Sequence, residues 1–323
     1  MDLHEYFPSE RAIFQKILEL EVKTRGRGWR LFLGRATRRV LPSFRLQARL
    51  ASLIGRSIKV SVMGKTLNMD LRDQAVSSEI FAHGVWEPEE TKFLERTLRP
   101  GMVFVDVGAN IGYYTVIASG LVGSTGRVYA FEPDPENFGL LKRNVTANQC
   151  QNVFINQKAV AASTRRLFLY RSGTNFGDHR TYDPQILPVR ERGAARSTVA
   201  VEAISLDEYF AAQPTNIDFI KIDIQGSEYD AFVGMRKTLR RNPGVTILTE
   251  FWPTGLRQAG LAPSALLDEV RADGFVIHRL EKGRLEEVSD TDILSRLADD
   301  EYTSLVLLKE EAAVLTATKG SAC

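Results

Sequence analysis

Apolar residues in the middle of the chain form short runs that alternate with stretches of helical spacing. The run at 102–107 (MVFVDV) is rich in β-branched residues and lies between a Pro-Gly pair and a glycine loop, which predicts a buried strand. The same alternation continues to the end of the chain. It predicts strands at 102–107, 127–131, 152–160, 217–222, 245–249, 275–279 and 304–308, and helices at 88–98, 113–121, 136–148, 226–240 and 264–272.

Strands that alternate with helices predict an α/β fold, in which a mostly parallel sheet is covered by helices on both faces. No long helix separates the last two of the seven predicted strands, so we expect these two to be antiparallel. We expect this Rossmann-like domain to span 76–310, between an N-terminal extension at 1–75 and a tail at 311–323.

Two segments depart from this alternation. In the extension, helical spacing at 8–25 and 29–53 is followed by a predicted β-hairpin at 58–70. Within the domain, 161–205 predicts a second hairpin (166–170 with 198–204) whose middle is polar and rich in Gly and Pro. A long irregular stretch inside a compact domain is typical of a functional or a disordered loop.

Charge is unevenly distributed along the chain. Twelve Lys or Arg residues and no acid lie between Glu21 and Asp70, so the net charge of +2 leaves −10 for the rest. The basic region from Lys23 to Lys65 is either a solvated cap or a peripheral contact for anionic surfaces.

The cysteines and the apolar segments indicate in which cellular compartment the protein is expected. The two cysteines, Cys150 and Cys323, form neither a disulfide framework nor a zinc pattern, which suits a reducing compartment. The N-terminus lacks the apolar core of a signal peptide, and no run of about 18 apolar residues predicts a transmembrane helix. We therefore expect a cytoplasmic protein.

Candidate cofactor residues follow the first two predicted strands. The first strand ends in Asp106-Val-Gly108-Ala-Asn110-Ile-Gly112, and the second is followed by Glu132. Glycines let a backbone approach a ligand closely, and a carboxylate after the second strand can accept from both hydroxyls of a ribose. The spacing Gly-x-x-x-Gly lacks the middle glycine with which dinucleotide sites admit a pyrophosphate. The pattern thus disfavours NAD and is compatible with S-adenosylmethionine (SAM), which has no phosphate.

Together these segments resemble a known family. DVGANIGYYT, FEPDPENF and KIDIQGSE, with SSEIFAHGVWEPEETKFL, QKAVAAS, ISLDEYF and TILTEF, make the chain similar to the FkbM family of SAM-dependent methyltransferases between about Ser77 and Phe251. The resemblance implies a class I methyltransferase sheet and methyl transfer to a hydroxyl of a sugar, glycan or secondary metabolite. It implies cofactor contacts at Asp106, Gly108, Asn110, Gly112, Tyr113, Glu132, Asn137 and Val160. Gln225 departs from the family, which often has Glu there.

Candidate catalytic groups are sparse. Transfer to a hydroxyl benefits from a base, and Asp223 at the end of the fourth strand is our first candidate because ligands bind at the carboxyl ends of parallel strands. His179, in the long loop, is the second, since its ordinary pKa suits a base. Glu228 is interpreted as a helix cap. Acceptor contacts are expected at His83, Trp86, Glu87, Asn175 and Glu250, and no metal site is expected.

Two other functions stay open. The basic region could contact the phosphates of a nucleic acid, but the fourth strand has Asp223-Ile-Gln-Gly rather than the Asn/Asp-Pro-Pro-aromatic motif of base amine methylation, so no nucleic-acid partner is expected. A non-catalytic binding module is the other alternative, because fold does not dictate function. The oligomeric state is not indicated by the sequence.

Overall fold

A computed structural model describes residues 57–183, 196–212, 215–297 and 301–309 of the chain. The helices expected at 8–25 and 29–53 and the tail at 311–323 lie outside these residues, as does most of the basic region from Lys23 to Lys65. The chain divides into two compact units, Met1–Trp86 and Glu87–Cys323. No helix among the described residues is long and apolar enough to cross a membrane.

The N-terminal unit contains the hairpin expected at 58–70, which the structure confirms. Strands β1 (Ser57–Val62) and β2 (Lys65–Asp70) pair in antiparallel fashion through a turn at Met63-Gly64, where both φ angles are positive. This geometry matches the right-handed twist of the two strands. Helix α4 (Val76–His83) follows and ends at Gly84, which adopts a left-handed conformation.

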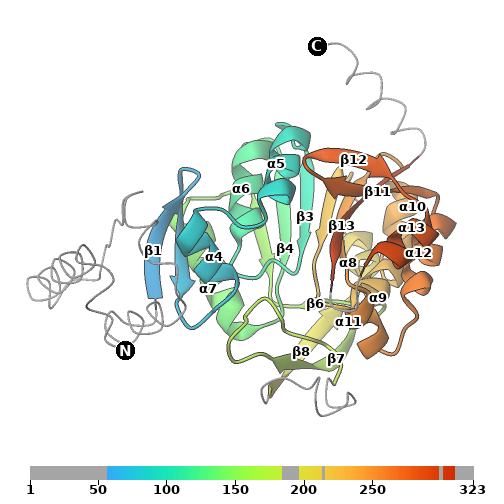
Figure 1. The fold of residues 1–323 in the computed structure, drawn as a ribbon. Coiled ribbons are helices and arrows are strands. Elements are labelled where there is room, and N and C mark those ends of the chain that lie inside the picture. The colour runs from blue at the N-terminus through green and yellow to red at the C-terminus, as the bar shows by residue number, and fades with distance from the viewer. Residues whose placement is uncertain (1–56, 184–195, 213–214, 298–300, 310–323) are drawn as a thin grey trace, which may run out of the picture. The chain divides into compact units, whose positions relative to one another are not determined.

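The C-terminal unit is built on a mixed, mostly parallel sheet (Figure 1). Its strand order is β12-β11-β13-β10-β9-β3-β4-β5, and the run from β10 to β5 is parallel whereas β13, β11 and β12 pair in antiparallel fashion. The α/β class and the antiparallel closing pair are therefore confirmed. The strands are β3 (Val103–Val107), β4 (Arg127–Phe131), β5 (Val153–Asn156), β9 (Phe219–Ile222), β10 (Thr246–Phe251), β11 (Phe275–Glu281), β12 (Arg284–Glu287) and β13 (Thr303–Lys309).

Helices cover both faces of this sheet. One face packs against α8 (Leu206–Ala211), α9 (Glu228–Val233), α10 (Arg236–Arg241), α11 (Pro253–Gln258), α12 (Pro263–Ala272) and α13 (Asp290–Arg296), which form the large apolar core with the strands. The other face packs against α5 (Pro88–Thr97), α6 (Tyr113–Val122) and α7 (Pro135–Ala147). Phe104, Asp106, Phe219 and Lys221 point to this second face, because side chains alternate along a strand.

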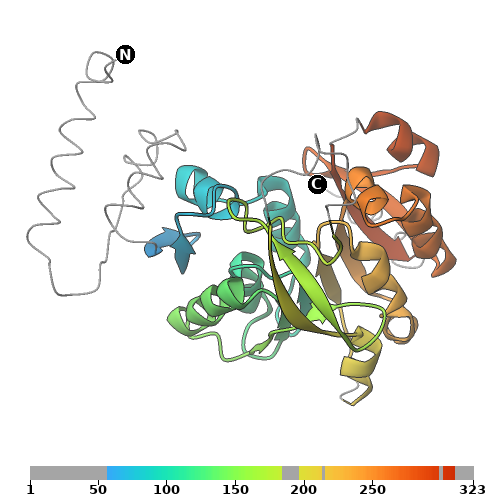
Figure 2. The same cartoon turned by 90° about the horizontal axis from the view of Figure 1, so that it is seen from below.

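Two predicted elements are divided in the structure. The strand expected at 152–160 ends at Asn156, and β6 (Ala159–Val160) joins a separate sheet with the hairpin β7 (Arg165–Arg171) and β8 (Ser197–Ile204), which Figure 2 shows from below. The helix expected at 226–240 breaks at Gly234, whose backbone lies against Ala161. An eighth strand, β12, was not predicted, because its turn at Lys282-Gly283 lacks the usual Asn-Gly signal.

The order of the strands determines where a ligand can bind. From the central strand β3 the chain proceeds to β4 and β5 on one side, and later to β9 and β10 on the other. Chain segments therefore diverge at the carboxyl ends of β3 and β9. Ligands in open parallel sheets bind at such a switch point.

The Gly234 contact gives a stability prediction. A Cβ at this residue would lie 2.1 Å from the carbonyl oxygen of Ala161, although its φ suits any residue. We expect Gly234→Ala to lower the free energy of unfolding by about 1–3 kcal/mol through overpacking, measured by denaturant titration. In the control Gly139→Ala, a Cβ would meet nothing closer than 3.8 Å inside α7, so stability should rise by roughly 0.5–1 kcal/mol. Equal stability of the two variants would contradict the contact.

Candidate functional site

The loop after β3 is held tightly between the ends of two neighbouring strands. The amides of Gly108 and Ala109 both donate to the carbonyl of Phe131 at the end of β4, at 3.0 and 2.9 Å. On the other side, a Cβ on Gly108 would lie 2.0 Å from the carbonyl oxygen of Asp223 at the end of β9. Gly108 has a φ of 85°, so both its conformation and its surroundings require glycine.

Gly112, the other glycine of the motif, faces helix α7. A Cβ there would lie 2.6 Å from the Cδ1 of Leu141, and the side-chain amide of Asn144 donates to the carbonyl of Ile111 at 2.7 Å. These contacts bring the start of α6 close to α7. Gly112 thus permits the packing of two helices behind the loop.

Glu132 lies at the centre of the predicted ribose site. Its side chain is buried, and its two oxygens accept from the backbone amides of Asn110 and Asp134, each at 2.8 Å. Burial raises the pKa of Glu132 to about 8, against the opposing effect of these two hydrogen bonds. Because a carboxylate oxygen can accept more than one hydrogen bond, each still has acceptor capacity for a hydroxyl.

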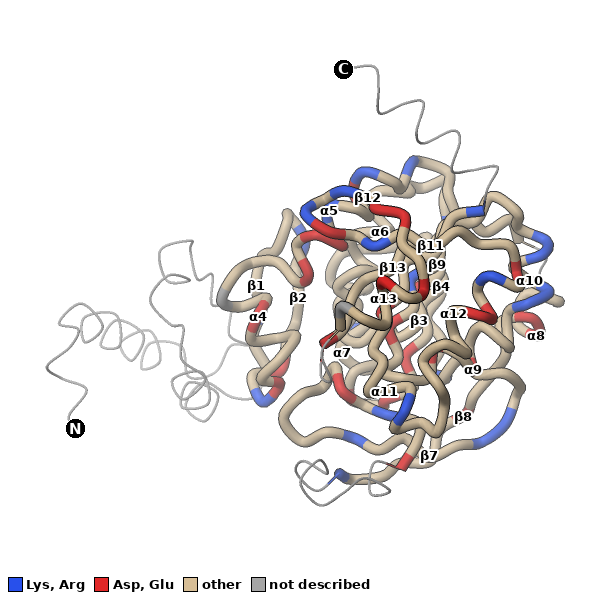
Figure 3. The backbone as a smooth tube through the Cα atoms, turned by 45° about the vertical axis from the view of Figure 1, so that its right-hand side comes forward, with Lys and Arg blue, Asp and Glu red and all other residues tan. Residues whose placement is uncertain are grey.

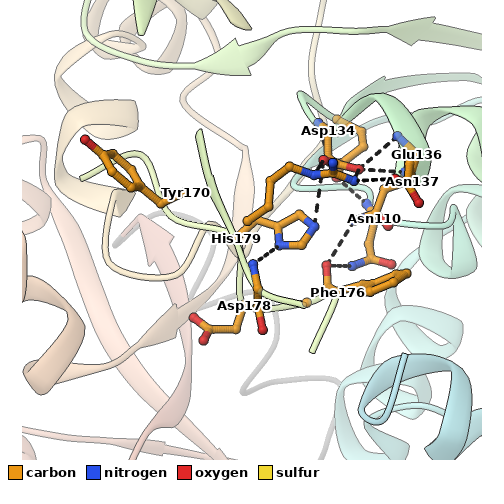
Figure 4. A network of polar contacts seen from close by, with 12 residues as sticks. Asn110, Asp134, Glu136, Asn137, Tyr170, Phe176, Asp178 and His179 are labelled. Carbon is orange, nitrogen blue, oxygen red and sulfur yellow. Dashed lines mark hydrogen bonds and ion pairs between the residues drawn. The ribbon is translucent and has the colours of Figure 1, made fainter. Parts of the chain in front are cut away.

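A segment of the long loop, residues 172–183, crosses this region, and we call it the strap. The side-chain amides of Asn110 and Asn137 both donate to the carbonyl of Phe176 in the strap, each at 2.9 Å (Figure 4). Asn175 shapes the turn before it by accepting from the amide of Gly177 at 2.9 Å. The two asparagines predicted to contact the cofactor therefore hold the strap, and Asn175, predicted to contact the acceptor, forms its turn.

His179 belongs to the same end of the strap. Its Nδ1 accepts from the amide of Ser172 at 3.2 Å, and its Nε2 lies 3.9 Å from the Asp134 carboxylate (Figure 4). Burial lowers the pKa of His179, although the Asp134 carboxylate opposes this effect. Asp134 follows β4 whereas Asp223 follows β9, and β3 separates the two strands. The structure thus does not bring the two candidate bases together.

The other end of the strap reaches β9 and β10. The Thr181 and Ser227 hydroxyls are 2.5 Å apart, and the Tyr182 hydroxyl donates to the carbonyl of Gln225 at 3.1 Å. The guanidinium of Arg180 lies over the ring of Trp252, 4.9 Å from its centre. The strap therefore connects the predicted cofactor side of the sheet edge with the side that carries Asp223.

A buried lysine that we did not single out from the sequence lies at the switch point. Lys221 is opposite Asp106 in the register of β9 and β3, and its Nζ lies 3.1 Å from Oδ2 of Asp223 and 4.6 Å from the centre of the Tyr114 ring. Burial alone would lower the pKa of Lys221, but the carboxylates of Asp223, Glu87 and Asp106 outweigh it and raise the pKa above its usual value. Lys221 is therefore a stable cation among carboxylates.

Helix α5 adds further carboxylates on the same face. Glu87 precedes the helix with a φ of 41°, and its Oε2 accepts from the Tyr114 hydroxyl at 2.7 Å. Burial raises the pKa of Glu87 to about 7, with Lys221 opposing the shift. Glu90 accepts from the hydroxyl of Ser304 at 2.6 Å. Glu87, just before α5, thus adds an acid near Lys221 to those in or after the strands.

Gln225 joins the two strand ends. Its Nε2 lies 2.9 Å from Oδ1 of Asp223 and 2.8 Å from Oε2 of Glu250. Burial raises the pKa of Glu250 well above its usual value, and the carboxylates of Asp223, Glu228 and Glu87 act in the same direction. Asp223 and Glu250, the first a predicted base and the second a predicted acceptor contact, therefore share one amide.

Other predicted residues lie elsewhere. The Tyr113 hydroxyl is 3.2 Å from that of Thr91 in α5, and Val160 is buried in β6. His83 pairs with Glu79 in the N-terminal unit, which also contains Trp86. Glu228 accepts from the backbone amides of Ile224 and Gly226, so its side chain holds the turn before α9 rather than serving as the cap of that helix.

Three residues at the sheet edge were missed by the sequence analysis. These are Lys221, Tyr114 and Phe176. Lys221 had a usable signal, because a lysine between isoleucines in a buried strand is rarely tolerated without ionic partners. Tyr114 and Phe176 had none, since nothing in their local sequence indicates what they contact.

Buried polar atoms without a partner show whether the residues of this site fit SAM. Oδ1 of Asp106 and Oδ1 of Asn137 are buried and have no hydrogen-bond partner among the described residues. Buried polar atoms are normally paired, so such atoms indicate a missing partner. The ammonium of a methionine moiety can donate to the first atom and a ribose hydroxyl to the second. The residues present therefore fit the cofactor.

Charged positions outside this site are dispersed over the C-terminal unit (Figure 3). Asp223 lies 3.1 Å from Lys221, Asp106 is opposite Lys221 in the sheet, and Glu250 and Glu87 also act on this lysine. Four acids around one cation make this the acidic part of the sheet edge.

Comparison with known proteins identifies the family. Residues 106–277 match the model of the methyltransferase FkbM domain, more than half of the chain. A protein-L-isoaspartate O-methyltransferase from Methanothrix thermoacetophila is 38% identical over 56 residues, which are 17% of this chain and only 27% of that protein.

Among solved structures, an FkbM methyltransferase from Methylobacillus flagellatus has a TM-score of 0.39 and 15% identity, over 83% of this chain and 58% of that one. A SAM-dependent O-methyltransferase from Thermotoga maritima has a TM-score of 0.40 and 13% identity, over 78% and 84%. On the match to the family model, the chain belongs to the FkbM family of SAM-dependent methyltransferases.

Proposed function

We propose that the protein transfers a methyl group from SAM to a hydroxyl of a sugar, glycan or secondary metabolite. One observation carries the proposal: the backbone of the cofactor loop at Gly108 lies directly against Asp223, whose carboxylate is held at the switch point. A methyl donor bound at this loop would lie next to a base.

Different residues would bind the ribose and the methionine moiety of the cofactor. Glu132 would accept from the ribose hydroxyls, and Oδ1 of Asp106 would accept from the ammonium of the methionine moiety. When bound, SAM supplies a methyl carbon on positively charged sulfur, and this carbon bonds to the acceptor oxygen as the carbon–sulfur pair stays on sulfur. Holding two reactants in line can supply much of the rate.

The proton of the acceptor hydroxyl would pass to Asp223. The Asp223 side chain is 22% exposed, so an acceptor can reach it, whereas Lys221 at 5% is closed off. Lys221 and Gln225 each hold one of its oxygens, which fixes the direction of the carboxylate. Glu87 and Glu250 lie near enough to affect the same charges and would line the acceptor site.

The charge of this region favours a neutral acceptor. Among the described residues, the acids Asp223, Glu87 and Glu250 outnumber the cation Lys221 here, which disfavours an anionic ligand. We therefore regard nucleic acid as the second candidate acceptor. The basic region from Lys23 to Lys65 could contact its phosphates, so the assay below includes RNA. Peripheral contact of that region with anionic surfaces and a cytoplasmic location are further parts of the proposal.

The position of Glu132 gives a prediction on cofactor binding. Glu132→Ala removes both acceptors for the ribose hydroxyls, and we expect the affinity for S-adenosylhomocysteine to fall at least about tenfold, because each lost hydrogen bond is worth about 0.5–1.5 kcal/mol. Titration calorimetry measures it. The control Glu202→Ala removes an exposed carboxylate that pairs with Lys158 and should leave affinity unchanged. Wild-type affinity in Glu132→Ala would refute the assignment.

Asp223 gives a prediction on turnover. We expect Asp223→Ala to lower methyl transfer about 100-fold or more, as loss of a general base implies, while the affinity for S-adenosylhomocysteine changes less than about threefold. The assay follows tritium from labelled SAM into methyl glycosides of rhamnose, glucose and galactose, into catechol, and into total RNA. Asp230→Ala, which removes an acid paired with Arg165, is the control.

The outcomes separate the candidate functions. Label in the glycosides or catechol supports the proposal, and label in RNA alone favours the nucleic-acid alternative. Cofactor binding with no transfer to any of these acceptors would count against the proposal. Unchanged transfer in Asp223→Ala would remove that residue from the chemistry.

A further inference from the structure

A single neutral side chain separates the two acids at the ends of β9 and β10. Nε2 of Gln225 donates to Asp223 at 2.9 Å and to Glu250 at 2.8 Å. An ionised carboxyl group only accepts hydrogen bonds, and the amide presents its nitrogen, not its oxygen, to both acids. Both N–H bonds of the amide are therefore used.

The backbone at this residue is held in an unusual conformation. Gln225 has a φ of 54°, a region that side chains other than Gly, Asn and Asp seldom adopt. Tyr182 of the strap donates to its carbonyl, and the Glu228 carboxylate accepts from the amides of Ile224 and Gly226 on either side. Strain of this kind persists where the surroundings enforce it, and it is concentrated at functional sites.

Many charges face this pair of acids. Asp106 lies in β3 and Lys221 in β9. The other titratable groups around the pair are Glu87 just before α5, Glu90 in α5, Glu228 in α9 and the Tyr302 hydroxyl before β13. Lys221 is the cation among them, and it is engaged with Asp223. The Glu250 carboxyl accepts from Gln225 at 2.8 Å. Two nearby carboxylates that lack donors tend to share a proton, which would remove a base.

We propose that Gln225 is a positioning residue for methyl transfer, which holds Asp223 and Glu250 as a fixed pair and keeps Asp223 able to accept the proton of the acceptor hydroxyl. The role in catalysis rests on the proposed function. The amide is suited to it because it offers two donors and carries no charge. A carboxyl group at this position would offer one donor, and only when protonated.

The variant Gln225→Glu tests whether the Gln225 amide joins Asp223 and Glu250, and the test needs no methyl acceptor. The introduced carboxyl lies among acids, so its pKa in the folded protein is raised above its unfolded value. Stability linked to it is then present at low pH and lost as pH rises through the folded pKa. We expect a Tm close to that of the wild type at pH 5 and several degrees lower at pH 8.5, measured on the full chain by differential scanning calorimetry.

Gln149→Glu is a matched control. Gln149 also has a positive φ, 55°, but it is exposed. The difference in Tm between Gln149→Glu and the wild type should therefore be the same at pH 5 and at pH 8.5. If the Tm of Gln225→Glu followed that of the wild type in parallel from pH 5 to 8.5, Gln225 would not be coupled to the two acids and the inference would be overturned.

The pH profile of methyl transfer tests the role in catalysis. For Gln225→Glu we expect the acidic limb of kcat/KM to move up by at least about one pH unit, because the added acid raises the pKa of the base. Affinity for S-adenosylhomocysteine should stay within threefold. Gln225→Asn adds no charge but has a shorter side chain, so we expect the acidic limb of its pH profile to move less than that of Gln225→Glu, even if its rate falls.

The two proposals fail in different ways. A rate that falls equally at every pH in Gln225→Glu, with an unmoved limb, would show a merely structural role and overturn the inference while the function stands. If the wild type methylates none of the glycosides, catechol or RNA, the proposed function fails and the catalytic role with it. The calorimetric result still decides whether the amide joins the two acids.

Discussion

The proposed site at the edge of the sheet depends on one buried cation. Lys221 occupies a strand position where an apolar side chain would normally lie, and it neutralises part of the charge of Asp106, Asp223 and Glu87. Leaving a buried charge without its partner typically costs about 3–5 kcal/mol. Without this cation the negative charge at Asp223 would lose its closest compensating positive charge, and the proposed role of Asp223 as a base would be lost with it.

The strap links this acidic region to the predicted cofactor side. Asn110 and Asn137 hold the carbonyl of Phe176 at one end, and Tyr182 holds the carbonyl of Gln225 at the other. His179, in the strap, accepts from the amide of Ser172 and lies beside Asp134. The same short segment thus contacts residues of both proposed binding regions, which gives the long loop a structural reason to cross the edge of the sheet.

Most of the fold could be predicted because it depends on local patterns. Apolar runs and helical spacing indicated the parallel strands, and the hairpins at 58–70 and 166–204 followed from alternation and turn residues. The errors arose where tertiary contacts override such patterns. Asn156 ends β5 because the next residues join another sheet, and Gly234 divides a helix because it packs against Ala161.

The sequence by itself determined the class of sheet, the glycine loop with Glu132 and the family. Each of these depends on residues that are close together in the chain or on motifs with a characteristic spacing. Only the tertiary structure decided which groups meet. The register of β3, β9 and β10 places Asp106, Lys221 and Glu250 on one face, and the strap brings Phe176 to two asparagines. Such partners are far apart in the chain, and the contacts between them are set by how strands pair and helices pack rather than by any local pattern.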